Sequence, residues 1–541
     1  MSANSSMATL SSGATRTNGP TDEEIAARGL SGEPGPTLQD VEKDAGLSGV
    51  GEEKASSGGT SKEEAHERDS DGVMLENGVP IVRLTGPDDP VSPLNMAKGR
   101  RWLIVILITS CSFCITCCSS MIPFTYPQVE AEFHISQEVA TLGLSLYVLG
   151  MGLFPLLVGP LSEWYGRLPV YQIGFTLFFI FQFMCAFANG PATLIIGRFL
   201  AGSSGSAFLS VAGGSVADLF KPAEVGAPMA FYTAGPFLAP ALGPVISGFI
   251  VQYTTWRWTW RVLIIWAGIE LLLLVLLVPE TYLPAVLKKK AKKLRKAGRA
   301  DVKAPIELDT RSIAAVIGTS CVKPFELLAL EPMALVLCTW TAILLGILYM
   351  AFTAWGIVYR AYGFETWQVG LTYIPLGLGI ALGGASHPFW AGYYRKKAKQ
   401  LQRRPPPEEH LRKGLYGAVI CPIALFWFAF TTYTSVHWIV SLIATVPFGF
   451  GIMLSFNAVF AFLVDAYRPY AASAMAANSA MRSSFAAAFP LFTTQMFAAL
   501  GTQYALMLCA FLCLAITPFP FLFFKRGHLY RKGSKFANRE E

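Results

Sequence analysis

Three ionisable residues lie inside long apolar stretches of this 541-residue chain: Arg198, Glu270 and Arg482. A charge in an apolar stretch is costly unless it meets a partner or a wet cavity, so such residues mark proton relays or binding sites. Burial favours the neutral form of Glu270, which suits a proton carrier, while a hydrogen-bonded structural carboxyl is the alternative. Asn478 precedes Arg482 by one helical turn, so both would share a helix face. We assign this pair to a substrate cavity, with helix packing or gating as the alternative.

Aromatic residues in the same stretches are candidates for the wall of that cavity. Tyr232, Tyr349 and Trp355 suit the binding of an amphiphilic molecule, and packing between helices or against lipid is the alternative for each. The sequence contains no phosphate-binding Walker A loop and no Ser/His/Asp constellation, which argues against ATP-driven pumping and hydrolysis. We therefore expect that the protein is not an enzyme and binds no cofactor. We expect a proton gradient to drive its transport.

Four cysteines, Cys111, Cys114, Cys117 and Cys118, recur at helical spacing. Metal-bound thiolates must be deprotonated and need supporting polar groups, which this apolar stretch does not offer. We interpret the cysteines as small residues of a membrane helix and expect no metal site.

Apolar runs of about 20 residues position all these candidates, and each run is long enough to cross ~30 Å of hydrocarbon. With 53% hydrophobic and only 15% charged residues, the chain is too apolar for a soluble protein. We expect an all-α membrane protein with twelve transmembrane helices in two six-helix bundles around a central cavity. The predicted spans are 102–124, 138–159, 170–188, 191–217, 227–251, 260–278, 334–356, 368–390, 415–433, 437–463, 471–497 and 501–524.

Basic residues cluster in three segments that twelve spans place on one side, at 288–296, at 395–404 with 412–413, and at 525–535. The positive-inside rule assigns these segments and both termini to the cytoplasm. Residues 1–92 carry 7 Lys and Arg against 17 Asp and Glu and few aromatic residues, so we expect a disordered acidic cytoplasmic tail. The predicted domains are this tail, an N-terminal bundle (100–278), a basic cytoplasmic linker (279–333), a C-terminal bundle (334–524) and a basic cytoplasmic tail (525–541).

A short charged loop joins the second and third predicted spans, with the pattern Gly159-x-Leu161-x-Glu163-x-x-Gly166-Arg167. Its glycines permit tight turns, and Glu163 and Arg167 carry opposite charges. The loop resembles the signature between helices 2 and 3 of the major facilitator superfamily. The resemblance implies a conformational lock that holds the two bundles in the outward-facing state. Glu163 stands where Asp is usual, and Leu168 and Pro169 replace a common basic pair, which implies a weaker lock.

Two further segments resemble signatures of the same superfamily. Arg198-x-x-x-Gly202 is similar to its helix 4 motif, whose arginine is associated with proton coupling; an arginine that snorkels to the outer interface is the alternative. The fifth span contains Pro240, Gly243, Pro244 and Gly248, which resemble the Gly-Pro bend of antiporters, although Ala239 and Ser247 replace expected glycines. Proline kinks a helix and glycine permits close approach of a neighbour. The bend favours export over import.

The segment PETYLPAVLKKKAKKLR (279–295), the stretch at 470–492 and the ending SKFA (534–537) resemble the fungal drug:proton antiporter family with twelve spans. The resemblance implies a proton-coupled exporter of small organic compounds: drugs, polyamines, or secreted metabolites such as organic acids or glycolipids. An uptake carrier and a non-transporting membrane receptor are the alternatives. The expected partners are a small-molecule substrate, protons and the lipid bilayer, with no nucleic acid. We expect a monomer in the plasma membrane, with the vacuolar membrane as the alternative location.

Overall fold

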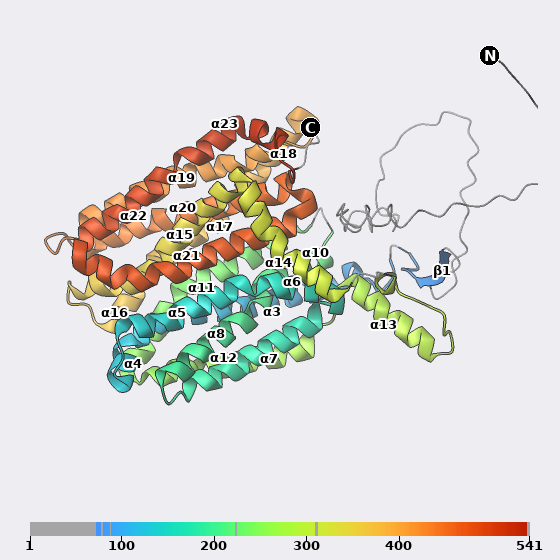
Figure 1. The fold of residues 1–541 in the computed structure, drawn as a ribbon, viewed down its shortest axis with the longest axis horizontal. Coiled ribbons are helices and arrows are strands. Elements are labelled where there is room, and N and C mark those ends of the chain that lie inside the picture. Colours follow the sequence, from blue (N-terminus) through green and yellow to red (C-terminus); the bar gives the residue numbers. More distant parts are fainter. Residues whose placement is uncertain (1–71, 77–78, 87, 222–223, 309–311, 538–541) are drawn as a thin grey trace, which may run out of the picture. The chain divides into compact units, whose positions relative to one another are not determined.

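The computed structural model describes residues 72–76, 79–86, 88–221, 224–308 and 312–537. Its long helices form two bundles that lie side by side, the earlier one blue to green and the later one yellow to red (Figure 1). The N-terminal bundle consists of α3 (Lys98–Met121), α4 (Tyr126–Phe133), α5 (Gln137–Leu153), α6 (Pro155–Tyr165), α7 (Arg167–Ala186), α8 (Pro191–Gly205), α9 (Ala207–Ser210), α10 (Ala212–Leu219), α11 (Gly226–Tyr253) and α12 (Trp256–Leu277).

The C-terminal bundle repeats this architecture with nine helices. They are α15 (Pro332–Arg360), α16 (Thr366–Leu371), α17 (Ile374–Ala385), α18 (His387–Leu401), α19 (Leu411–Thr431), α20 (Trp438–Ala466), α21 (Ala471–Leu500), α22 (Thr502–Ile516) and α23 (Pro518–Lys532). Among the described residues, twelve helical segments have the length and apolar composition to cross a membrane. The pair α5 and α6, bent by 41° at the break before Pro155, meets the same limits when the two helices are taken together. Proline at this break cannot donate the helical hydrogen bond, which accounts for the bend.

Each of the twelve predicted spans coincides with one of these helices or helix pairs. The additional apolar helix is α14 (Ile313–Leu330), which lies in the segment that the sequence assigned to the linker. It packs against α6 of one bundle, α21 of the other and α15, so it crosses the junction between the bundles. Val322 and Phe325 stay largely exposed on it. The predicted basic cytoplasmic linker (279–333) thus contains an apolar helix at 313–330 that the sequence analysis did not anticipate, and its cytoplasmic location stays a prediction.

The predicted disordered tail also needs correction, because described residues 72–92 are folded. Strands β1 (Val73–Glu76) and β2 (Val79–Val82) pair antiparallel. Val82 N–H donates to the carbonyl of Lys303 at 2.9 Å, so the linker extends this small sheet. A second apolar core joins Val82 to Leu287 and Ala291 of α13 (Leu283–Lys296). We call this unit the hairpin module (the described residues of 72–92 and of 283–307); the rest of the predicted tail lies outside the described residues.

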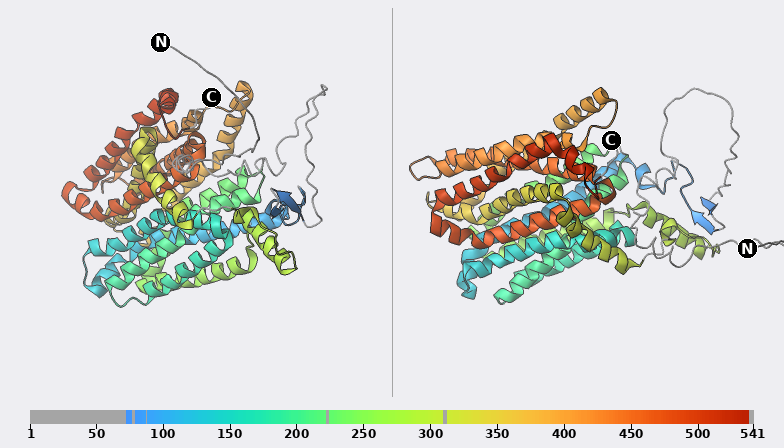
Figure 2. Two further views of the ribbon diagram at one scale, coloured as in Figure 1. Left: turned by 45° about the vertical axis from the view of Figure 1, so that its right-hand side comes forward. Right: turned by 45° about the horizontal axis from the view of Figure 1, so that its top comes forward.

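Helix α13 projects beyond the ends of the bundle helices instead of lying across them (Figures 1 and 2). Its apolar side faces the small sheet, and Lys289, Lys292 and Lys293 are exposed on the other. At the C-terminus, the predicted tail from residue 525 begins as the last turns of α23. Ser534 then donates to Glu331 between α14 and α15 at 2.6 Å, which fixes the ending to the C-terminal bundle.

Candidate functional site

The loop between α6 and α7 turns at Gly166, which has φ +99°. A Cβ atom at Gly166 would meet the carboxylate of Glu280 and, at 3.0 Å, the Cβ of Ala285. Only glycine both adopts this positive φ readily and leaves room for Glu280 and Ala285. The structure thus explains why glycine occupies this position of the predicted lock.

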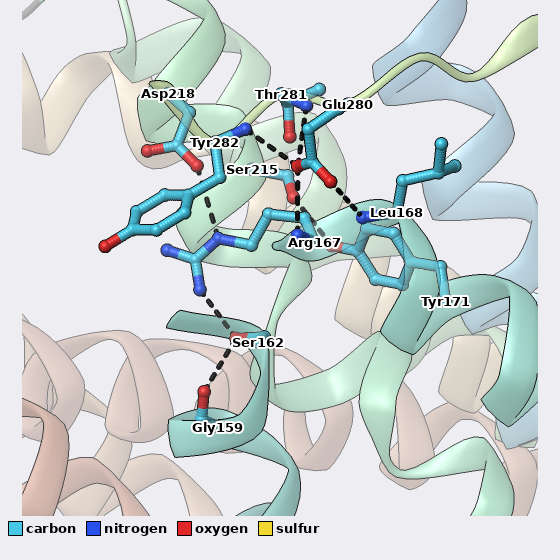
Figure 3. Close-up of polar contacts among 10 residues, drawn as sticks. All are labelled: Gly159, Ser162, Arg167, Leu168, Tyr171, Ser215, Asp218, Glu280, Thr281 and Tyr282. Carbon is cyan, nitrogen blue, oxygen red and sulfur yellow. Dashed lines mark hydrogen bonds and ion pairs between the residues drawn. The ribbon is translucent and has the colours of Figure 1, made fainter. Parts of the chain in front are cut away.

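Arg167 follows as the first residue of α7, with only 7% of its surface exposed. Its Nε donates to Asp218 of α10 at 3.3 Å, and its Nη1 donates to Ser162 Oγ at 2.7 Å (Figure 3). The guanidinium also lies over the ring of Tyr282, 4.7 Å from its centre. Burial raises the pKa of Tyr282 to about 12, so this ring stays neutral beside the arginine. A buried charge needs such partners, and here α6, α10 and the segment after α12 supply them.

Glu280 holds the same loop through its backbone (Figure 3). One carboxylate oxygen accepts from the N–H groups of Arg167 at 2.9 Å and of Thr281 and Tyr282 at 3.0 Å, and the other accepts from Leu168 N–H at 3.2 Å. Arg167 and Leu168 begin α7, so the carboxylate satisfies amides that have no acceptor within the helix and lies at the positive end of the helix dipole. Glu280 thus ties α7 to the segment that follows α12.

The two opposite charges that the sequence singled out in this loop, Glu163 and Arg167, do not contact each other among the described ion pairs and hydrogen bonds. Glu163 is exposed, and the carboxylates that contact Arg167 are Asp218 and Glu280. The partners of Arg167 described above all belong to the N-terminal half of the chain. The link from this loop to the other bundle, which a lock between bundles requires, stays a prediction. Glu280 was missed as a site residue, although it lies in the sequence Pro279-Glu280-Thr281 that carried the family resemblance.

Arg198 is fully buried inside the N-terminal bundle. Its Nε donates to the carbonyl of Gly143 at 3.1 Å and its Nη1 to the carbonyl of Cys118 at 3.2 Å. The guanidinium lies 3.9 Å from the ring centre of Tyr147 and 5.1 Å from that of Trp260. An arginine that snorkels to the interface would be exposed, so the structure excludes that alternative. Among the described residues, its Nη2 lacks a hydrogen-bond partner.

Glu270 of α12 is buried against α3, with 6% of its surface exposed. Its carboxyl group contacts the hydroxyl of Ser110, the thiol of Cys111 and, at 3.3 Å, the indole N–H of Trp266. All three are neutral groups, which stabilise a carboxylate less than a cation would. The contacts fit both the structural carboxyl and the proton carrier. The structure does not bring Glu270 and Arg198 together, because their contacts on α3 lie seven residues apart, about 10 Å along the helix.

The predicted antiporter bend lies in the part of α11 that packs against α3 of its own bundle and against α16 of the C-terminal bundle. Pro240 and Pro244 lie inside the unbroken helix α11, and Gly243 faces Cys117 and Ser120 of α3. A Cβ at Gly243 would come within 2.7 Å of the Cys117 carbonyl. One turn later, Gly248 faces α16 of the C-terminal bundle: its Cβ would lie 3.3 Å from the Cα of Gly370. A Cβ at Gly370 would in turn meet the Pro244 carbonyl at 2.6 Å. These glycines allow two backbones from different bundles to touch.

The five predicted cavity residues do not gather in one place. Tyr349 hydrogen-bonds to Ser119 of α3 at 3.0 Å, which joins the bundles at their centre. On the neighbouring helix α21, Asn478 donates to Thr341 at 2.8 Å, and Arg482 lies over the rings of Phe456 and Phe460 at 5.3 and 4.8 Å.

The other two residues pack inside single bundles. Tyr232 donates to the carbonyl of Phe208 at 3.0 Å within the N-terminal bundle. Trp355 packs on Tyr373 within the C-terminal bundle, with ring centres 4.3 Å apart. Both contacts fit helix packing, which was the alternative for each. The assignment of all five to a substrate cavity stays a prediction.

Two helical bundles that span a membrane, meet through small residues and enclose partnered charges define a secondary transporter. Residues 108–490 match the family model described as Major Facilitator Superfamily, and the chain belongs to this family. This confirms the predicted fold class and the transporter class.

Curated relatives agree with this family and are fungal. The chain is 42% identical to the efflux pump atB of Aspergillus terreus, over 84% of this chain and 90% of the relative. It is 38% identical to the probable drug/proton antiporter YHK8 of Saccharomyces cerevisiae, over 87% and 92%. It is also 40% identical to the multidrug transporter mdrA of Aspergillus fumigatus, over 84% and 75%. The predicted resemblance to the fungal drug:proton antiporter family is thereby confirmed.

A solved structure shows the same fold. The partially occluded inward-open conformation of the xylose transporter XylE from E. coli matches with a TM-score of 0.56 and 17% identity, over 79% of this chain and 98% of that one. At this identity, the match concerns the fold alone.

Proposed function

We propose that the protein exports small organic compounds by alternating access, in exchange for protons. The observation that carries this proposal is the close packing of the Gly-Pro segment of α11, whose backbone lies against α3 at Gly243 and against α16 of the other bundle through Gly248 and Gly370. A contact between bare backbones excludes side chains and leaves no room for water, so it suits a tight seal at the moving junction. The names of the relatives, which are efflux pumps and antiporters, support export.

In this proposal Glu270 carries the proton and Arg198 couples it to the cavity. The neutral donors around Glu270 allow it to gain or lose a proton without breaking an ion pair. Both residues contact α3, the helix that also joins the C-terminal bundle through Ser119 and Tyr349. A change in charge at either residue can therefore act on the junction through one rigid helix.

The loop of Gly159, Glu163, Gly166 and Arg167 acts in this proposal as the conformational lock. The contacts of Arg167 and Glu280 support it as a rigid cytoplasmic base for α7.

The basic segments support a chain with both termini in the cytoplasm, in the plasma membrane. In this proposal the protein works as a monomer in the lipid bilayer. It binds a small-molecule substrate and protons, and it needs no cofactor.

Accumulation of labelled compounds, in cells with and without the protein, tests this function at outside pH 5 and pH 7.5. Proton-driven export lowers the internal amount, does so more strongly at pH 5, and stops with an uncoupler. The substitution Glu270→Gln keeps the hydrogen-bonding shape and removes the titration, so we expect export to lose its dependence on outside pH. The matched control is Asp301→Asn, an exposed acid outside the proposed sites, at which export should keep that dependence. Raised accumulation would instead show uptake.

A further inference from the structure

A hollow of about 330 Å³ lies between the two bundles, at the end marked by α4 and α16 and opposite to the loop network (Figure 1). This volume lies within the usual range of small-molecule sites. Residues of α4, α5 and the turn between α3 and α4 line it on one side, and residues of α15 and α16 line it on the other. Because both bundles contribute, the hollow must change shape when they move.

The hollow has an aromatic wall and an unpaired hydroxyl group. Phe124 and Phe352 come from opposite bundles and are both buried. Thr353, with 6% of its surface exposed, also lines the hollow, and its hydroxyl makes no hydrogen bond to any described residue. A buried hydroxyl without a partner costs free energy, so a ligand that reached this hydroxyl and hydrogen-bonded to it would recover that cost.

Two opposite charges complete the lining. Glu130 extends from α4 and Arg360 from the end of α15. They face the same hollow from different bundles, and among the described residues Arg360 acts on Glu130 through space without an ion pair within 4 Å. A ligand with one charge would meet one attractive and one repulsive group here, whereas a ligand with both charges would meet two attractive groups.

We propose that this hollow binds a small aromatic zwitterion, whose cationic group meets Glu130, whose anionic group meets Arg360, and whose ring lies against the aromatic wall to which Phe124 and Phe352 belong. The inference rests on the proposed function in one respect: in an exporter with cytoplasmic termini, the hollow opens to the outside, and it is the site from which substrate is released.

The test uses a cysteine at Gly356, which lines the hollow and where an added Cβ meets no atom within 4 Å. The native cysteines are buried except Cys321, which is partly exposed on α14. Intact cells with Gly356→Cys are treated with a membrane-impermeant methanethiosulfonate, in the presence of tryptophan, tryptamine or indole-3-propionate. These three probes share one ring and are a zwitterion, a cation and an anion. Ile357→Cys serves as a second reporter if the first variant does not fold.

We expect labelling from outside, and protection by tryptophan at concentrations about tenfold lower than by either singly charged probe, which is the effect of one charge-assisted hydrogen bond. Glu130→Gln should remove the advantage of tryptophan over indole-3-propionate, and Arg360→Gln its advantage over tryptamine. The matched control Glu132→Gln, an acid on the same helix that pairs with Arg257, should change neither.

Equal protection by all three probes would overturn the proposed ligand class, and absence of labelling from outside would overturn the proposed opening. Labelling does not require transport. If the hollow selects tryptophan but no compound is exported, the site stands and the proposed function fails. If export is found but the probes protect equally, the function stands and the site fails.

Discussion

Two acids of the loop network can be tested against each other. The structure shows Glu280 holding the start of α7, whereas the sequence singled out Glu163. We consider the substitution Glu280→Gln. The carboxylate accepts four backbone hydrogen bonds, from Arg167, Leu168, Thr281 and Tyr282. Hydrogen bonds to a charged group contribute ~1.5–3 kcal/mol each and neutral ones ~0.5–1.5 kcal/mol, so loss of the charge weakens three of them by about 1 kcal/mol each.

The amide group of glutamine worsens the fourth bond, because its NH₂ must face the N–H of Leu168. A buried donor without an acceptor costs ~1–3 kcal/mol. Asp218 lies near the same arginine, and reduced repulsion between the two acids offsets part of the loss. We expect a net cost of about 3 kcal/mol for keeping the start of α7 closed, which raises the population of the open loop about 150-fold.

Hydrogen exchange on the peptide that covers 159–171 measures this effect. The amides of Arg167 and Leu168 should exchange about 150-fold faster in Glu280→Gln, because their exchange follows local opening. Glu163→Gln is the matched control: an exposed substitution changes stability by about 0.5 kcal/mol at most, which limits the change in exchange to about twofold. The reasoning is refuted if Glu163→Gln accelerates exchange and Glu280→Gln does not, because Glu163 would then be the partner that holds the loop.

Three further predictions concern other regions. Gly243→Val should abolish transport at equal surface expression, because its side chain would enter the space of Cys117 and Ser120, whereas Gly213→Val, where no atom lies within 4 Å, should keep it; equal transport by both variants would contradict this. Arg198→Lys should lower the initial efflux rate about tenfold or more, because one ammonium group cannot reach the carbonyls of Gly143 and Cys118 and also stack on Tyr147; an unchanged rate would refute a coupling role. The hydrogen bond from Arg295 lowers the pKa of Glu307 to about 2, so this carboxylate stabilises the hairpin module above about pH 4.5, and the stabilisation is lost as pH falls towards 2. Limited proteolysis of the linker at a series of pH values should show that loss, and Glu307→Gln should cleave equally at pH 5 and pH 3.

The membrane helices could be predicted because hydrocarbon thickness requires long apolar runs, and the positions of Arg198 and Glu270 followed from them. Helix α14 was missed because Lys323 and Glu326 interrupt its apolar run and because its neighbours in sequence are basic. The hairpin carried a recognisable signal, Asn77-Gly78 between two apolar runs, which the acidic composition of the whole segment outweighed. The partners of Arg167 could not be read from sequence, because Asp218 and Glu280 lie 51 and 113 residues away from it.

The distribution of strong and weak contacts bears on how the two bundles could move. Each bundle contains its own ion pairs. The N-terminal bundle has Arg167–Asp218 and Arg257–Glu132, and the C-terminal bundle has Arg468–Asp465 and Arg531–Glu408. Between the bundles, the buried contacts include the neutral hydrogen bond of Ser119 and Tyr349 and the glycine contacts of Gly248 and Gly370. The carboxylates that accept hydrogen bonds across the junction, Glu138 from Gln495 and Glu365 from Gln252, are exposed, so water can replace these bonds when the junction opens. A neutral hydrogen bond contributes only ~0.5–1.5 kcal/mol, and a glycine contact breaks without leaving a charge unpaired. Each bundle can therefore stay rigid while the junction between them opens at low cost, which is what alternating access requires.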